Sequence, residues 1–270
     1  MIILRTDAKI KHRRNNADLK FTTDGLIIKE TNVGESDRAV VALTRDKGKV
    51  SAFVSGARKP KSKNAAATAL LSFSSLTFNH TKDTYRITES EAVEVFFGLR
   101  TDIQKLSLAQ YICELCQVLV PFEVEGEDFL RLALNSLHFI AEGKMDIYAV
   151  KALTELRMMV IAGFMPDLVG CRNCGTDRGF PMFLDINGGD MLCNDCKASA
   201  AVQGNFAVLD RTTFAAMRHI AYSDFKRLYS FSLPPQNARY LSFVTERYLS
   251  AQTDHRFKTL DFFHSLETQM

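Results

Sequence analysis

The sequence predicts an α+β protein in which a small closed β-barrel is followed by a helical domain with a cysteine-bearing insertion. Apolar residues recur with a period of two between residues 25 and 97, and with a period near 3.6 after Arg100. Four of the six cysteines gather in a glycine-rich segment between the later helices. A length of 270 residues favours two domains of ordinary size.

The composition is that of an ordinary globular protein, with 46% apolar and 24% charged residues. The longest nearly unbroken apolar stretch, Met158 to Met165, is far shorter than the roughly 20 residues that a transmembrane helix needs. The first residues show neither the apolar core nor the cleavage site of a secretory signal. We therefore expect a soluble, cytoplasmic protein without a membrane partner.

Charge is distributed unevenly along the chain. Residues 1–65 carry 15 Lys or Arg against 7 Asp or Glu, whereas residues 66–270 carry 19 against 24. Such asymmetry indicates a nucleic-acid-binding surface on the N-terminal part, although a charged stretch is often simply a solvated surface. Residues 1–22 lack any sustained period and contain a cluster of cations, so we expect a basic N-terminal arm; the cluster comprises Lys9, Lys11, Arg13 and Arg14.

Five short strands are expected in the first domain, residues 23–100. They are rich in branched residues and bounded by turn residues, and they cover residues 26–28, 39–43, 50–54, 70–78 and 85–97. Residues 45–49 form a hairpin connection in which Gly48 can take a positive φ. Five short strands that begin as a meander suit an OB-fold, because closure of the barrel removes exposed edges.

Helices are expected through the second domain, residues 101–270. Apolar residues follow helical spacing over residues 106–120, 127–141, 147–164, 210–222, 234–249 and 260–266. Residues 168–200 interrupt this pattern as the glycine-rich insertion. Within it, the stretch from Phe180 to Ile186, followed by Asn187 and two glycines, predicts a hairpin.

Two CxxC pairs separated by 18 residues lie in the insertion, Cys171 with Cys174 and Cys193 with Cys196. Two thiolates three residues apart on a tight turn can bind one side of a metal ion, and a second pair completes the tetrahedron of zinc. A thioredoxin-like redox pair would need a βαβ context that is not visible, and a reducing compartment disfavours disulfides. We expect one structural Zn²⁺ per chain, because four cysteines leave no open position for catalysis.

The two remaining cysteines, Cys113 and Cys116, form a third CxxC within the apolar helical stretch from Tyr111 to Val120. Buried thiols behave as small hydrophobic groups. No further cysteine pair is left in the sequence to complete a second tetrahedron. We therefore expect both residues in the core.

A second candidate site is a basic stretch beyond the third strand, made of Arg58, Lys59, Lys61 and Lys63. Four cations in six residues cannot be buried, so we expect a flexible positive loop whose natural use is contact with phosphates. The same barrel segment adds three more candidate DNA-binding residues, Arg38, Lys47 and Lys49. No aromatic residue stands between residues 57 and 72, so contacts to the nucleic-acid backbone should dominate over base stacking.

The sequence offers no catalytic constellation. It contains no P-loop, no GxGxxG, no GxSxG and no HExxH. His138 and His219 lie within apolar helical stripes and are expected to be structural. We therefore expect a protein that is not an enzyme.

The order of these features resembles the RecO family of bacterial DNA repair proteins. The resemblance covers about residues 23–265 and rests on residues 25–28, 34–38, 44–49 and 56–63 and on the late CxxC pairs. It implies an N-terminal OB-fold and a helical domain with a zinc-binding insertion, which only some members have. The family's basic barrel surface corresponds here to Arg38, Arg58, Lys59, Lys61 and Lys63, and its zinc ligands correspond to Cys171, Cys174, Cys193 and Cys196. The arm of about 22 residues is a departure, because members usually begin close to the first strand.

The resemblance also implies a function, recombination mediation. Such proteins bind single- and double-stranded DNA, anneal complementary strands, and act with RecR to load RecA on strands coated by single-stranded-DNA-binding protein. None of these partners follows from composition or spacing. We expect a nucleoid-associated mediator of recombinational repair; an OB-fold and zinc-ribbon RNA-binding factor is the alternative, because a barrel with a basic loop serves RNA equally well. A nuclease would need to show metal-dependent cleavage.

Overall fold

The computed structural model describes residues 19–81, 84–200 and 203–267. The strands are β1 (Leu19–Val33), β2 (Asp37–Thr44), β3 (Gly48–Val54), β4 (Ser72–Thr81), β5 (Thr84–Val95), β6 (Met182–Asp185), β7 (Met191–Leu192) and β8 (Phe206–Leu209). The helices are the short 3-10 turn η1 (Phe97–Leu99), α1 (Ile103–Leu119), α2 (Glu127–Glu142), α3 (Ile147–Ile161), α4 (Asn194–Ala200), α5 (Arg211–Tyr222), α6 (Pro235–Thr253) and α7 (Lys258–Glu267).

The expected basic arm lies mostly outside the described residues, which begin at residue 19. Its last four residues, 19–22, belong to β1, because they pair with β4 along the barrel. The chain forms two compact units. Residues 19–142 and 257–267 make up the first unit, and residues 143–256 make up the second.

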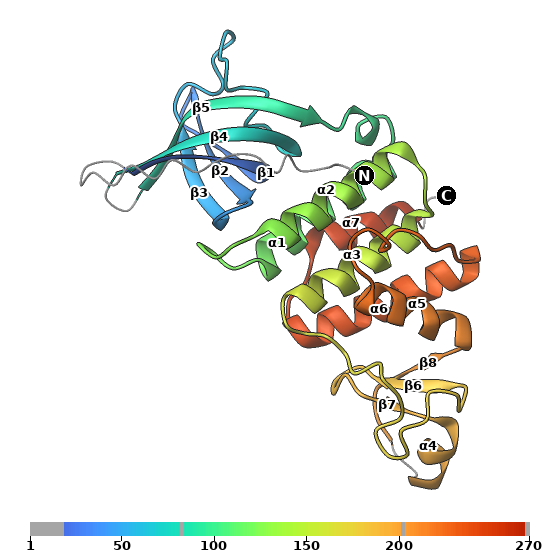
Figure 1. Ribbon diagram of the computed structural model, residues 1–270. Coiled ribbons are helices and arrows are strands. Elements are labelled where there is room, and N and C mark those ends of the chain that lie inside the picture. The colour runs from blue at the N-terminus through green and yellow to red at the C-terminus, as the bar shows by residue number, and fades with distance from the viewer. Residues whose placement is uncertain (1–18, 82–83, 201–202, 268–270) are drawn as a thin grey trace. The chain divides into compact units, whose positions relative to one another are not determined.

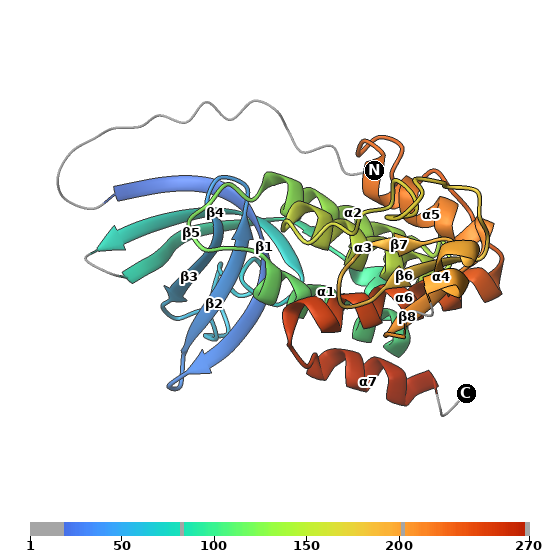
Figure 2. The same cartoon turned by 90° about the horizontal axis from the view of Figure 1, so that it is seen from below.

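The five N-terminal strands of the first unit close a barrel in the order β1-β2-β3-β5-β4 (Figure 1). The strands β3 and β5 run parallel, whereas the other neighbours run antiparallel. With 15 residues, β1 is long enough to pair with both β2 and β4, and this double pairing closes the sheet; Figure 2 shows its curvature. The predicted α+β fold class with an N-terminal OB-fold barrel is confirmed.

The barrel core follows from the alternation of side chains along each strand. In β3, Val50, Ala52 and Val54 are buried, while Ser51 and Phe53 between them are exposed. This is the period of two that a half-buried strand requires. The buried side chains of the barrel form one cluster: Ile27, Val40, Ala42, Val50, Ala52, Val54, Ala57, Leu76, Phe78 and Ile87.

Gly48 turns the chain between β2 and β3 with a φ of 53°, which confirms the positive φ expected from the sequence. A Cβ at this position would lie 2.6 Å from the carbonyl oxygens of Pro121 and Val124. The connection between α1 and α2 therefore crosses the hairpin too closely for any side chain. The backbone N–H of Lys49 donates to the Pro121 carbonyl at 3.2 Å and fixes this approach.

Polar side chains cap the starts of the helices, and α1 begins at Ile103, three residues before the expected start at residue 106. Asp102 accepts the backbone N–H groups of Gln104 and Lys105 at 2.8 and 3.1 Å and caps α1. In the same unit, α7 packs along α1, because Glu114 accepts the backbone N–H of Thr259 at 2.9 Å.

Among the described residues, no helix combines the length and apolarity needed to cross a membrane.

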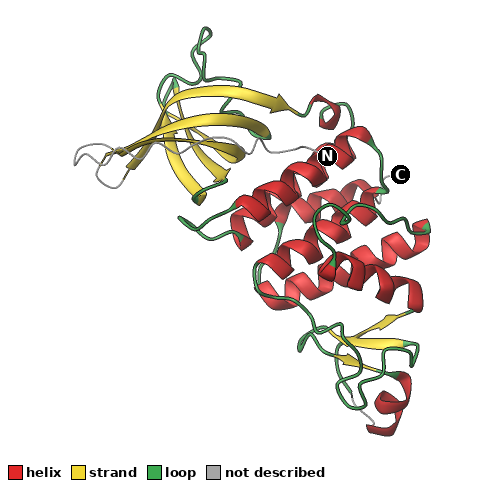
Figure 3. Ribbon diagram, in the orientation of Figure 1, coloured by secondary structure: helices red, strands yellow, loops and turns green. Residues whose placement is uncertain are grey.

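The second unit combines the helices α3, α5 and α6 with a small three-stranded sheet in the order β7-β6-β8 (Figure 3). The predicted hairpin is present as β6 and β7. The third strand, β8, and the short helix α4 were not expected from the sequence. The strand β8 forms because it pairs along the free edge of β6, from Met182 opposite Leu209 to Asp185 opposite Phe206.

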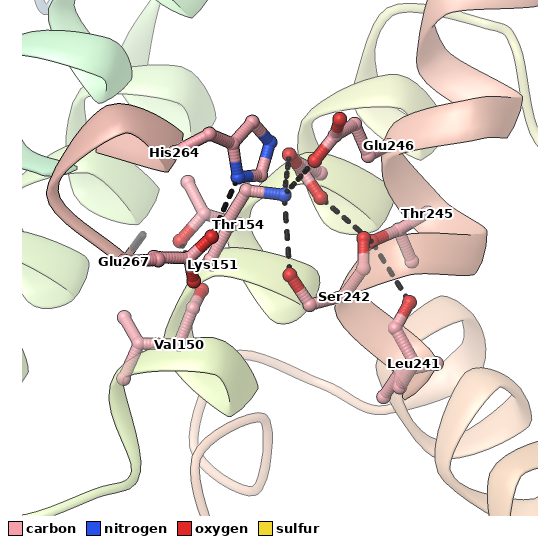
Figure 4. A network of polar contacts seen from close by, with 10 residues as sticks. Val150, Lys151, Thr154, Leu241, Ser242, Thr245, Glu246, His264 and Glu267 are labelled. Carbon is pink, nitrogen blue, oxygen red and sulfur yellow. Dashed lines mark hydrogen bonds and ion pairs between the residues drawn. The ribbon is translucent and has the colours of Figure 1, made fainter. Parts of the chain in front are cut away.

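A buried polar network joins α3 to α6 (Figure 4). Lys151 is 1% exposed, and its Nζ lies 2.8 Å from Glu155, 2.9 Å from Glu246 and 3.1 Å from the Ser242 hydroxyl. The second oxygen of Glu155 accepts the Thr245 hydroxyl at 2.6 Å. The carboxylates raise the pKa of Lys151 against the effect of burial, which by itself would lower it. A buried ammonium needs such partners, so the network sets how α3 and α6 align.

Candidate metal centre and DNA-binding surface

The four cysteines of the two late CxxC pairs converge on one point of the second unit. Their sulfur atoms all lie within 4.8 Å of one another, and the Cys174 and Cys193 sulfurs are 3.7 Å apart. A tetrahedron with Zn–S bonds of about 2.3 Å has S···S edges of about 3.8 Å. Cys171, Cys174, Cys193 and Cys196 therefore fit a tetrahedral metal ion with four thiolate ligands.

Tight turns present these sulfurs. The Gly175 N–H donates to the Cys171 carbonyl at 2.8 Å, and Gly175 itself has a φ of 75° that favours glycine. In the second pair, the N–H of Cys196 points at the Cys193 sulfur at 3.4 Å, as the first turn of α4 begins. Gly179 allows the second CxxC pair to approach closely, because a Cβ at residue 179 would lie 2.8 Å from the Cβ of Cys193.

The electrostatics of the cluster favour a cation. Burial alone would raise the pKa of Cys171, but backbone N–H groups of Cys193, Cys174 and Asn173 lower it to about 6. Hydrogen bonding with the Cys193 and Cys174 sulfurs raises the pKa of Cys196 to about 12. Cys171 thus ionises more readily and Cys196 less readily than a free thiol, because several thiolates so close together repel one another. A divalent ion removes that conflict and holds all four as thiolates.

The metal module, residues 164–200 and 203–209, is attached to the helices of its own unit. The Tyr248 hydroxyl of α6 donates to the Phe164 carbonyl at 3.2 Å, and the Gln252 amide donates to the Ile186 and Asn187 carbonyls, each at 3.1 Å. On the other side, Arg218 of α5 pairs with Asp177 at 3.1 Å. These contacts place the metal module on a preformed helical support.

The third CxxC has a different environment. Cys113 and Cys116 are buried in α1, as expected from the sequence. Burial raises the pKa of Cys113 well above its usual value and raises the pKa of Cys116 to about 12. Both are therefore protonated thiols at neutral pH, in the first unit of the chain, whereas the four clustered cysteines belong to the second.

Four of the candidate DNA-binding cations project from the connection between β3 and β4. Their side chains are exposed: Arg58, Lys59, Lys61 and Lys63. The connection is held in successive turns, in which the N–H of Ser62 donates to the Lys59 carbonyl at 2.9 Å and the N–H of Lys59 donates to the Gly56 carbonyl at 3.1 Å. These four residues, named the basic loop below, are exposed within six residues of one connection, with no acidic residue between them in the sequence.

The start of the basic loop is tied to the barrel. Asp37 accepts the backbone N–H of Gly56 at 2.8 Å and the Ser36 hydroxyl at 3.1 Å, and these hydrogen bonds lower the pKa of Asp37. The loop that the sequence predicts to be flexible is thus fixed at the point where it leaves β3.

Arg38 is placed differently from the basic loop. Its guanidinium donates to the Ala65 carbonyl at 3.1 Å and to the Thr68 hydroxyl at 3.2 Å, and it lies 3.4 Å from Glu30. The side chain is only 13% exposed. Arg38 therefore holds the later part of the connection between β3 and β4, at Ala65 and Thr68, and adds little to the exposed charge.

Lys49 and Lys47 also lie away from the basic loop surface. Lys49 is buried, and its ammonium donates to the Gln117 carbonyl and lies 4.4 Å from the Phe122 ring centroid. This burial lowers the pKa of Lys49. Lys47 is half-buried, with its Nζ 5.1 Å from the Phe21 ring centroid.

A groove on the barrel was not expected from the sequence. It has a volume of about 270 Å³ and is lined by residues of β1, β2, β3 and β5, among them Lys29, Phe53 and Tyr85. Phe53 is 43% exposed and is the last residue but one of β3, the strand that leads into the basic loop. The alternation of β3 already indicates that Phe53 faces outward, since its neighbours Ala52 and Val54 are buried. An exposed aromatic ring therefore lies on the strand that leads into the basic loop, although the loop itself contains none.

Comparison with known proteins agrees with this architecture. Residues 19–96 match the model of the recombination protein O N-terminal domain, and residues 100–261 match that of the recombination protein O C-terminal domain. The first match covers the barrel, and the second begins just before α1 and extends into α7.

Curated proteins named DNA repair protein RecO match along most of their length. The protein of Symbiobacterium thermophilum is 30% identical over 254 residues, which cover 92% of this chain and 98% of the relative. That of Acetivibrio thermocellus is 27% identical, over 91% of this chain and 96% of the relative. That of Caldicellulosiruptor bescii is 29% identical, over 91% and 98%. With both halves matched in order, the chain belongs to the RecO family and has a role in recombinational DNA repair.

Proposed function

We propose that this protein is a non-enzymatic, DNA-binding recombination mediator. It binds single- and double-stranded DNA, anneals complementary strands, and acts with RecR to help load RecA on strands coated by single-stranded-DNA-binding protein. It does so in the cytoplasm, at the nucleoid. Family membership supports the repair role, and the basic loop supports the contact with DNA.

The single observation that carries the DNA-binding proposal is the exposure of four cations on one short, anchored loop. Exposed Lys and Arg neutralise phosphates and release condensed counterions, which gives affinity without reading sequence. Phe53, at the base of the loop, adds a ring on which a base of an unpaired strand can stack. Arg38 and Lys49 have other partners, so we assign the DNA contact mainly to Arg58, Lys59, Lys61 and Lys63.

We further propose that the metal is one Zn²⁺ per chain, held by Cys171, Cys174, Cys193 and Cys196. Four thiolates at tetrahedral spacing are the ligand set that zinc prefers in structural sites, with no position open for water. The ion would hold the two CxxC pairs of the metal module together. Elemental analysis of the purified chain should find about one equivalent of zinc, and two equivalents would contradict the assignment.

The DNA contact can be tested by changing Arg58, Lys59, Lys61 and Lys63 together to Ala. With about 0.7 counterions released per neutralised phosphate, the slope of log K against log salt on single strands should flatten by about 2 to 3. All sequences should be weakened alike, because phosphate contacts carry no base information. The measurement is fluorescence anisotropy over a range of salt, on chains with and without residues 1–18.

A matched control removes the same charge from exposed cations elsewhere, by changing Arg100, Lys144, Arg178 and Lys226 to Ala. This control should keep at least most of the slope. If the loop variant without residues 1–18 keeps the wild-type slope, the DNA site is not on the basic loop. Competition with RNA of the same sequence then separates a DNA mediator from an RNA-binding factor.

Mediation itself requires a second assay. Annealing of complementary strands coated with single-stranded-DNA-binding protein should depend on the chain and should change when RecR is added. The loop variant should anneal more slowly in proportion to its weaker DNA binding. If the loop variant anneals strands at the wild-type rate, then mediation does not depend on DNA binding by the basic loop.

A further inference from the structure

The second unit carries an exposed aromatic and cationic face that neither the fold nor the metal explains. Along α6, the outward positions at helical spacing carry Arg239, Tyr240, Phe243 and Arg247. Phe243 is 52% exposed, which is unusual for a large ring at the middle of a packed helix. The inward positions of the same helix hold the buried Leu241, Val244 and Leu249.

The rings and cations of this face are arranged in close pairs. The guanidinium of Arg247 lies 5.3 Å from the Phe243 ring centroid, and the Tyr240 ring lies 6.3 Å from it at an interplanar angle of 34°. The guanidinium of Arg239 lies 4.3 Å from the Tyr148 ring centroid. Such spacings are those of cation–π pairs and of tilted ring stacks.

Polar contacts hold two of these groups in position. The Tyr240 hydroxyl donates to the Val208 carbonyl of β8 at 2.8 Å, and Arg247 donates to the Asn205 side chain. Both partners belong to the metal module. The rings are therefore oriented before any ligand arrives, which reduces the entropy lost on binding.

The outer side of the small sheet adds further rings. Phe206 and Val208 alternate with the buried Ala207 and Leu209, so both lie on the outer side of β8. Phe183 of β6 pairs with Val208, which places it on the same side. The ammonium of Lys197 lies 4.9 Å from the Phe183 ring centroid and 5.1 Å from that of Phe206.

Acidic side chains near this face are engaged elsewhere. Glu246 of α6 pairs with the buried Lys151, and Asp185 of β6 accepts the backbone N–H groups of Asn187 and Gly188. The cations of this face are Lys197, Arg239 and Arg247, and the exposed Asp195 lies on α4 two residues before Lys197. This favours an anionic partner with flat apolar parts.

We propose that this face, made by α6 and the outer side of β6 and β8, is a second site for single-stranded nucleic acid. Bases would stack on Phe243 and Tyr240, and Arg239, Arg247 and Lys197 would contact phosphates. Unpaired strands offer both chemistries at once, because each base has a π-face and each link carries a charge. A duplex hides its bases within the stack and would gain only the phosphate contacts. The inference rests on the proposed DNA-binding function and extends it to a separate surface.

The test uses the absence of tryptophan from the chain. Phe243→Trp introduces a single indole at the centre of the face, and its fluorescence should be quenched when an oligomer of dT stacks on it. An abasic oligomer of the same length should quench it little. Phe262→Trp on α7 is the matched control, since Phe262 is also an exposed helical ring at 46%, and it should show no quenching.

Affinity gives a second readout. Phe243→Ala should weaken dT oligomer binding about tenfold, the effect of losing one base stack, and should change abasic oligomer or duplex binding less than twofold. Changing Arg239 and Arg247 together to Ala should flatten the single-strand salt slope by about 1.4. Phe243 is exposed and outside the core, so its replacement should leave the thermal midpoint unchanged.

The outcomes separate this site from the basic loop. Quenching that persists when Arg58, Lys59, Lys61 and Lys63 are changed to Ala would establish two surfaces. Normal dT binding without quenching, and with Phe243→Ala equal to Phe262→Ala, would overturn the second site, leave the proposed function intact, and point to a protein partner for this face. If the wild-type chain does not bind DNA at all, both the second site and the proposed function are overturned.

Discussion

The pair Cys113 and Cys116 has the same spacing as the pair Cys171 and Cys174, yet the two regions use their thiols in opposite ways. In α1 the backbone N–H groups are consumed by helical hydrogen bonds, and apolar neighbours surround both sulfurs, so burial raises the pKa of each thiol. In the metal module, backbone N–H groups point at the sulfur of Cys171 and lower the pKa of this thiol. A CxxC spacing therefore indicates a ligand pair only where the chain makes a turn.

The cations of the barrel show the same division. Arg58 extends from the surface, and its guanidinium donates to the Gly34 carbonyl at 3.2 Å. Arg38 instead donates to two partners beneath the loop and lies beside Glu30. The residue type is the same, so the difference comes from the backbone position that carries each side chain: Arg38 lies on β2, and Arg58 lies in the connection after β3. Charge counts thus overstate the number of cations that the barrel presents to solvent.

The largest expected effect distinguishes the two kinds of cysteine directly. Changing Cys193 and Cys196 to Ser should abolish metal binding and expose the backbone of residues 165–200 to hydrogen exchange, while the barrel keeps its DNA binding. A structural zinc site contributes about 10 kcal/mol or more of binding free energy, which is coupled to folding of the segment. Equal hydrogen-exchange protection in variant and wild type would count against a structural metal.

The matching change in α1 should have a smaller effect of another kind. Changing Cys113 and Cys116 to Ala should leave one equivalent of metal bound and lower the free energy of unfolding by about 1 to 3 kcal/mol, through loss of buried volume. Elemental analysis and denaturant unfolding measure the two effects separately. Loss of metal from this variant would make the comparison between the cysteine regions wrong.

Arg38 and Arg58 form the next matched pair. Arg38→Ala should lower the free energy of unfolding by about 1 to 2 kcal/mol, because it leaves the Ala65 carbonyl and Thr68 without their donor. Its salt slope for DNA should stay close to that of the wild type. Arg58→Ala should change stability by less than about 0.5 kcal/mol but flatten the slope by about 0.7. A reversed pattern would show that Arg38 is a DNA contact.

The smallest expected effect concerns pH and the start of the basic loop. The pKa of Asp37 is lowered from 3.8 in the folded state, so its hydrogen bonds stabilise the protein above pH 3.8 and lose this contribution as pH falls below that value. The difference in free energy of unfolding between wild type and Asp37→Asn should therefore shrink as the pH is lowered through this range. A difference that stays constant from pH 6 to pH 3 would contradict the role of the Asp37 carboxylate.

Much of the fold could be predicted because local chemistry dictates it. The strand over residues 50–54 and the turn at Gly48 are local features that the sequence predicts, and both are present in the structure. The strand β8 was missed because its four residues, Phe206–Leu209, carry too short a pattern to be recognised alone. It exists because β6 offers an unpaired edge, which is a long-range condition.

The sequence by itself determined the four-cysteine ligand set, the positive character of residues 58–63, and the order of barrel and helices. These depend on residue type and short spacing, which a single chain displays openly. Long-range packing gives Arg38 and Lys49 hydrogen-bond partners within the first unit and places Phe53 in the lining of a groove. It also decided that the rings of α6 continue toward the small sheet through the bond from Tyr240 to Val208. The physical reason is that a side chain's solvent exposure and partners depend on elements distant in sequence, whereas its charge and ligand atoms do not.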